Sequence, residues 1–284
     1  MSLPVSHSEP LSRPVEVTLV TRATVSRVWE AWTDPVRLVE WFADRAKGTV
    51  ATGELLTWSF DHPASEMTFR VSPFTSPGRL VLESVAGNPS QLEVLVTPGH
   101  DGTRISLTHT GLPGQQSWEQ DRHTLASSWQ LALSVLRYYV EFHYAEPRRT
   151  FFASRIGRFS ASRLTTLFRE PSGLQEWLTD GGSLGTPGGR VHLALKSGEI
   201  LRGDMLADTG TDIAMAWDEI GGVLQFRSLA VPQEPHLRLV TAVGWGWGLL
   251  SERARQIEAD LDAALERLDR AADIEAGQGA LQSH

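Results

Sequence analysis

The side chains best suited to acid–base or metal chemistry in this 284-residue chain are its nine histidines, because imidazole titrates near neutral pH and ligates metals. They are scattered without the spacing of a metal site, and the lack of cysteine excludes thiolate sites and disulfides. The chain also lacks the G-x-S-x-G, H-E-x-x-H and P-loop motifs. We therefore predict no metal, no cofactor and no catalytic residue, and we favour a protein that is not an enzyme.

His109 is the one histidine whose neighbours place it inside the protein. The stretch TRISLTHT (103–110) alternates in the manner of a strand, so His109 shares a face with Ile105 and Leu107. Such a position has two interpretations, a packed core residue or a catalytic base.

Two further features bear on nucleic acids and nucleotides. The glycine-rich stretch 181–189 precedes a strand-like run, whereas a dinucleotide site needs such a loop to open a helix, so we interpret it as the approach to a hairpin. The net charge of −8 argues against a general nucleic-acid binder, which needs a cationic face to displace counterions. We predict neither kind of partner.

The beginning of the chain and its apolar runs indicate where the protein resides. The stretch MSLPVSHSEPLSRP lacks the basic-then-apolar pattern of a signal peptide. No apolar run approaches the roughly 20 residues that span a bilayer. With no cysteine in the chain, we expect a cytoplasmic protein without a membrane span.

One phrase occurs twice in the chain. DPVRLVEW (34–41) returns as EPSGLQEW (170–177), and at this offset of 136 the stretch 26–53 has eight identities in 28 positions, against about two expected by chance. A period this long indicates a duplicated domain, because solenoid units are shorter. At the position of His109 the second copy has Val243, which favours the core interpretation of that histidine.

The repeated phrase predicts a helix start in both copies. Asp34 and Glu170 each precede a proline, which fits the first turn of a helix at no cost in hydrogen bonds. The leucine and tryptophan that follow are three residues apart and share one helical face. About six short strands with turn signals between them come next, and a long amphipathic helix closes each copy. We predict tails at 1–14 and 276–284 and domains at 15–145 and 146–275, which the duplication allows to pack as a pseudo-dimer.

This order of elements resembles the activator-of-heat-shock-protein-90-ATPase-like branch of the START/Bet v 1-like (SRPBCC) superfamily. The first copy carries the resemblance in VSRVWEAWTDPVRLVEWF, SPGRLVLES, DGTRISLTHTGL and SSWQLALSVLRYYVE. The second, more diverged copy carries it in FSASRLTTLFREPSGLQEWL, TPGGRVHLAL, LRGDML and IAMAW. The resemblance implies an α+β fold of two tandem helix-grip domains, each a curved antiparallel sheet of six to seven strands around its last helix with an apolar cavity between them.

The same resemblance implies a function, for which three hypotheses remain. The leading one is non-catalytic binding of a small apolar molecule, with the first copy favoured as the site. The alternatives are a protein-interaction module of the co-chaperone kind, and a cyclase or hydrolase acting on a hydrophobic substrate. The candidates for lining a cavity are Trp41, Phe69, His109, Trp129, Trp177 and Trp217.

The third strand of the first copy poses a conflict. In the second copy, alternate residues of 191–195 form one apolar face, and the offset maps them onto alternate residues of 55–59. An apolar stripe of Leu56, Trp58 and Phe60 is then left on the opposite face. Either this stripe is an exposed interface, or the first copy is shifted by one residue, which reverses every side chain.

Overall fold

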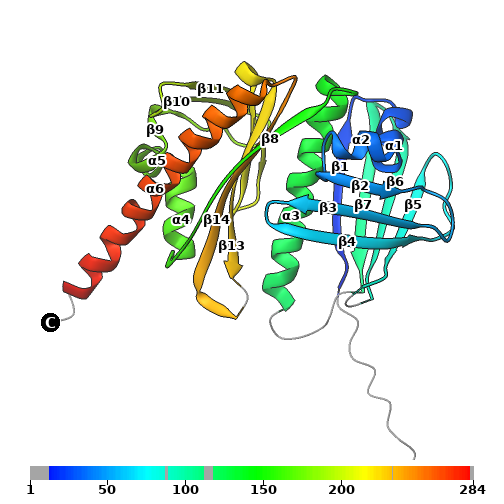
Figure 1. Ribbon diagram of the computed structural model, residues 1–284, viewed down its shortest axis with the longest axis horizontal. Coiled ribbons are helices and arrows are strands. Elements are labelled where there is room, and N and C mark those ends of the chain that lie inside the picture. Colours follow the sequence, from blue (N-terminus) through cyan, green and yellow to red (C-terminus); the bar gives the residue numbers. More distant parts are fainter. Residues whose placement is uncertain (1–12, 87–88, 112–117, 232, 282–284) are drawn as a thin grey trace, which may run out of the picture. The chain divides into compact units, whose positions relative to one another are not determined.

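The computed structural model describes residues 13–86, 89–111, 118–231 and 233–281 (Figure 1). The chain divides into two compact units, residues 1–129 and 130–284. This division falls inside the long helix α3, whereas the predicted domain bounds follow the sequence repeat and stay a prediction. Within the described residues, no helix is both long and apolar enough to cross a membrane.

The first unit is built around a seven-stranded antiparallel sheet with the strand order β1-β7-β6-β5-β4-β3-β2. Its strands are β1 (Val15–Thr21), β2 (Arg45–Gly48), β3 (Leu55–Asp61), β4 (Ala64–Val71), β5 (Arg79–Ser84), β6 (Gln91–Gly99) and β7 (Gly102–Thr110). Its helices are α1 (Val25–Thr33), α2 (Pro35–Val39) and the first part of α3 (Trp118–Tyr138). Sequential strands pair from β2 to β7, and β1 joins the sheet beside β7.

The second unit repeats this plan with the strand order β8-β14-β13-β12-β11-β10-β9. Its strands are β8 (Arg148–Gly157), β9 (Thr179–Ser183), β10 (Arg190–Leu195), β11 (Ile200–Asp208), β12 (Ile213–Trp217), β13 (Gly222–Val231) and β14 (Glu234–Trp247). Its helices are the end of α3 with a π-helical turn (Tyr139–His143), α4 (Ala161–Arg169), α5 (Pro171–Trp177), a 3-10 turn (Asp218–Ile220) and α6 (Ser251–Leu281). The two sheets have the same topology, so the predicted α+β class and tandem helix-grip fold are confirmed.

The repeated phrase begins a helix in both units, as predicted. Helix α2 begins at Pro35 and α5 begins at Pro171. Oδ1 of Asp34 accepts a hydrogen bond from the backbone N–H of Val36 at 2.9 Å, whereas the longer side chain of Glu170 makes no such bond. The first copy therefore has the better-capped start.

The tryptophan that ends the phrase fastens two helices together in the same way in each unit. Nε1 of Trp41 donates to the carbonyl oxygen of Ala31 at 2.8 Å, and Nε1 of Trp177 donates to the carbonyl oxygen of Leu167 at 2.8 Å. The two donor residues are 136 positions apart in the chain, and so are the two acceptor residues. The duplication therefore preserves a specific hydrogen bond as well as the sequence phrase. Both tryptophans are fully buried.

The third strand settles the register conflict in favour of a one-residue shift. Leu56 and Trp58 are buried with 4% and 1% of their surface exposed, and Phe60 is half-buried. Leu55 is 45% exposed instead. This corrects the alternative of an exposed stripe, because the side chains that would form it point into the core.

Candidate functional site

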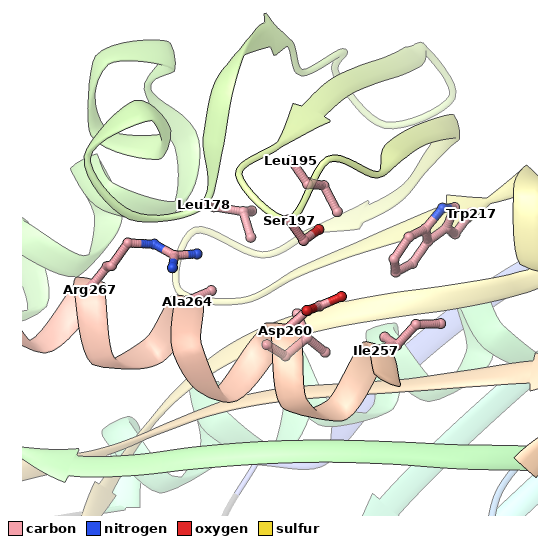
Figure 2. A pocket seen from close by; sticks show the side chains of 9 residues that line it. Leu178, Leu195, Ser197, Trp217, Ile257, Asp260, Ala264 and Arg267 are labelled. Atoms are coloured by element: carbon pink, nitrogen blue, oxygen red, sulfur yellow. The ribbon is translucent and has the colours of Figure 1, made fainter. Parts of the chain in front are cut away.

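The second unit contains a hollow between α6 and the sheet (Figure 2). It encloses about 10 Å³, and the empty space amounts to about 290 Å³ when the part open to solvent is included. The lining residues are Leu178, Leu195, Ser197, Trp217, Ile257, Asp260, Leu261, Ala264 and Arg267. Six of these nine are apolar, and the other three are a hydroxyl, a carboxylate and a guanidinium.

One side of the hollow is a stripe along α6. Ile257, Leu261 and Ala264 follow one another at spacings of four and three, which places them on one helical face. All three are buried. Asp260 and Arg267 lie beside this stripe and are half-buried, so their polar ends border an apolar surface.

The opposite side comes from α5 and the strands. Leu178 directly follows α5, Leu195 ends β10, and Trp217 ends β12. Nε1 of Trp217 donates to the carbonyl oxygen of Ile200 at 3.0 Å. The indole is thereby held in place with its one polar atom satisfied, and it offers the hollow an apolar surface.

Two arginines tie α6 to the rest of the unit at either end of the hollow. Nη2 of Arg253 donates to Oε2 of Glu199, at the turn between β10 and β11, at 2.5 Å. Nε of Arg267 donates to the carbonyl oxygen of Trp177 at 2.8 Å. The helix is thus fixed on both sides of the hollow.

The interior of the first unit is filled by aromatic rings. Trp32 meets Trp41 edge to face with centroids 5.0 Å apart, and it also contacts Trp58 and Trp129. A smaller hollow of about 200 Å³ lies between α1–α2 and β2–β3. It is lined by Trp32, Thr33, Pro35, Leu38, Ala46, Lys47, Val50, Leu56 and Trp58.

The lining of the hollow in the second unit differs in side-chain size from the equivalent place in the first unit. In the first unit, Phe42 stacks on Trp129 with centroids 5.8 Å apart. At the offset of 136 the second unit has Leu178 in place of Phe42, and α6 contains no aromatic residue that could replace Trp129. Leu178 lines the hollow, so an aliphatic side chain lies where the first unit has a stacked ring.

His109 is buried, with 5% of its surface exposed. Its Nδ1 lies 3.3 Å from Nε1 of Trp129. An indole N–H can only donate, so Nδ1 accepts and the proton of the neutral imidazole lies on Nε2. Burial lowers the pKa of His109 to about 4. In this tautomer Nε2 is a donor, and it has no partner within the described residues, so the geometry does not present a general base.

The predicted site residues are distributed over two places. Trp217 lines the hollow of the second unit, and Trp177 supplies only a backbone carbonyl beside it, because its indole bonds within the core. The other four candidates, Trp41, Phe69, His109 and Trp129, lie in the core of the first unit. Prediction did not identify the polar pair of the hollow, Asp260 and Arg267, because nothing in their spacing separates them from the many other charges of α6. Among the described residues, no group of three or more potential metal ligands is brought together.

Part of the chain is similar to a known protein family. A model of the family described as "Activator of Hsp90 ATPase homolog 1-like protein" matches residues 22–141. No match was found among curated proteins.

Three solved structures illustrate the likeness. The crystal structure of DynU16, from the dynemicin biosynthetic locus, is similar over 91% of this chain and 98% of its own, at 21% identity and a TM-score of 0.42. CalU16 from Micromonospora echinospora is similar over 45% of this chain and 75% of its own, at 24% identity and a TM-score of 0.38. The Aha1 dimer from Colwellia psychrerythraea covers 46% of this chain and 97% of its own, at 13% identity and a TM-score of 0.41. Identities this low say nothing of activity or ligand.

Proposed function

From the premise that the first copy of this chain belongs to the activator of Hsp90 ATPase homolog 1-like family through residues 22–141, we propose that the protein binds a small, largely apolar molecule without transforming it. The fold is that of hydrophobic-ligand-binding or co-chaperone-like modules. The observation that carries the proposal is the hollow between α6 and the sheet of the second unit (Figure 2). Ligand sites are typically concave and mostly apolar with a few placed polar groups, and the lining of this hollow has that composition.

The size of the hollow limits the ligand. Pockets for drug-sized molecules are usually about 300–1,000 Å³, whereas the enclosed part of this hollow is about 10 Å³, which is room for about one water molecule. A molecule with a short alkyl chain or a single ring would therefore have to displace side chains of the lining as it enters. The ring-filled interior of the first unit suits a structural role, which moves the proposed site from the first copy to the second.

The two other hypotheses have less support. The co-chaperone hypothesis relied on an exposed stripe, and burial of Leu56 and Trp58 removes its centre. The cyclase or hydrolase hypothesis relied on His109 as a base, and its Nε2–H tautomer makes the imidazole a donor. Neither has a second feature in its favour.

Filling the hollow tests the proposal. We expect the Ala264→Phe substitution to abolish binding of octanol, because Ala264 lies in the middle of the lining and a phenyl ring would occupy the space. Binding is measured by isothermal titration calorimetry and by the chemical shift of the Trp217 indole N–H, which reports from the wall of the hollow. Overpacking is expected to cost about 1–3 kcal/mol of stability, so folding is checked by circular dichroism.

A neighbouring alanine provides the matched control. Ala263 is on the same helix, half-buried, and outside the lining, so Ala263→Phe should bind octanol as the unchanged protein does. The proposal fails if the unchanged protein shows no saturable binding of octanol below millimolar concentration. It also fails if Ala264→Phe binds octanol as well as the Ala263→Phe control.

A further inference from the structure

We infer that the smaller hollow of the first unit is a binding site for one long-lived water molecule. Trp32 and Thr33, the last two residues of α1, both line this hollow. The water would accept a hydrogen bond from Nε1 of Trp32 and donate one to the hydroxyl oxygen of Thr33. The site lies in the first unit, so it does not depend on the ligand that we propose for the second.

The indole of Trp32 has a donor in the core that lacks an acceptor. The side chain is 2% exposed, and among the described residues its Nε1 is buried without a hydrogen-bond partner. A buried N–H that gives up its bond to bulk water costs stability, so nearly all such groups are paired with the protein or with ordered water. An indole nitrogen can only donate, so its partner must be an acceptor.

The neighbouring indole of Trp41 shows what the indole of Trp32 lacks. The two rings meet edge to face with centroids 5.0 Å apart, and both are buried. Nε1 of Trp41 donates to the carbonyl oxygen of Ala31 at 2.8 Å. Trp41 thus has a backbone acceptor, whereas Trp32 has none among the described residues.

The hollow has the size and the polar groups that suit water. It encloses about 10 Å³, which is room for about one water molecule. Oγ1 of Thr33 donates to the carbonyl oxygen of Trp29 at 2.8 Å, so the hydroxyl hydrogen is engaged and the oxygen can still accept. A donor from Trp32 and an acceptor from Thr33 give a buried water the two partners that it needs to remain.

The second unit has neither of these groups. Helices α1 and α4 begin and end at the offset of 136, so Phe168 corresponds to Trp32 and Arg169 to Thr33. Phe168 is buried and carries no N–H, so nothing at this position requires an acceptor. The water site therefore belongs to the first copy, and phenylalanine fits this position of the fold.

Nuclear magnetic resonance on the full chain with isotope-labelled tryptophan tests the inference, by transfer of magnetisation from water to the indole N–H groups. The resonance of Trp32 is assigned by its loss in Trp32→Phe. We expect this N–H to show a cross-peak with water, of the sign that a dipolar contact gives. The N–H of Trp41 should show none, because a backbone carbonyl already accepts from it.

Filling the hollow distinguishes a bound water from the hydroxyl proton of Thr33, which also exchanges with water. Ala46 lines the hollow, so Ala46→Val should keep the N–H resonance of Trp32 and remove its cross-peak with water. Ala64→Val makes the same change at an exposed position of β4 outside the lining and should keep the cross-peak.

Three results would overturn the inference. The first is the absence of a water cross-peak at Trp32 in the unchanged protein, and the second is an equal cross-peak at Trp41. The third is a cross-peak that persists in Ala46→Val, since the contact is then with the hydroxyl of Thr33 or with water outside the hollow. The first two need only the unchanged protein, so the inference can be overturned even if Ala46→Val fails to fold.

Discussion

Truncation of Trp177 to alanine is expected to destabilise the second unit by about 3–5 kcal/mol, and truncation of Trp41 should cost the first unit about as much. Each indole is fully buried and each fastens a short helix to its neighbour by a 2.8 Å hydrogen bond. Alanine would leave a cavity the size of an indole and release the helix that the proline-started phrase begins.

Urea unfolding followed by circular dichroism measures both costs. Phenylalanine at either position keeps much of the buried area and removes only the N–H donor, so each Trp→Phe substitution should cost about 1–2 kcal/mol. Trp245→Ala is the control, because that indole is only half-buried and its ring faces the guanidinium of Arg148 at 5.4 Å, an arrangement of smaller value. Equal losses for Trp177→Ala and Trp245→Ala would contradict the fastening role.

The duplication could be predicted from the sequence because the residues that it preserves act on their near neighbours in the chain. A proline at a helix start and a leucine–tryptophan pair on one helical face both involve neighbours within eight residues. Their structural roles can therefore be predicted without a structure. The topology followed from the same regularity, since two copies of one element order can fold into two copies of one sheet. The duplication is also seen in the hydrogen bonds, because the indoles of Trp41 and Trp177 bond to equivalent backbone carbonyls.

The register of the third strand could not be derived from the offset. The mapping of 191–195 onto 55–59 assumes that no residue is gained or lost in the loop before the strand, and one residue there reverses every side chain. In the structure, Trp58 lies inside, where it packs against Phe69 at 4.8 Å and Phe42 at 5.4 Å. Only these long-range contacts fix the register.

The position of the hollow could not be predicted from the sequence either, because it depends on how side chains of different size pack together. Large aromatic residues are the candidates that the sequence offers for lining a cavity, and most of them belong to the first copy. In the structure those rings pack on one another, as Phe42 does on Trp129. The open space lies where the second copy has the smaller residues Leu178 and Ala264. A comparison of ring-bearing positions between the copies would have been the useful signal.

Acidification is expected to destabilise the first unit through His109. Its pKa falls from the ordinary value of 6.5 to about 4 because burial disfavours the charged imidazolium. Between these two values the unfolded chain takes up a proton that the folded unit refuses, so stability is lost as the pH falls through this window and the loss levels off below about pH 4. The full difference corresponds to about 3 kcal/mol, of which most should be lost by about pH 4.5.

The His109→Val substitution isolates this contribution from the titration of the acidic residues. The sequence offset matches His109 with Val243, but the strand pairing corrects this, because His109 lies opposite Val15 and the equivalent Phe151 lies opposite Gly244. Valine is chosen because it keeps an apolar side chain at the buried site and removes the titrating group. Urea unfolding of the two proteins at neutral pH and at about pH 4.5 gives the comparison. The stability of the unchanged protein should fall by about 2–3 kcal/mol more than that of the variant over this interval. Parallel losses in both proteins would mean that His109 takes up its proton in the folded state, which would require a polar partner or a solvent path at Nε2 and would return the imidazole to consideration as an acid–base group.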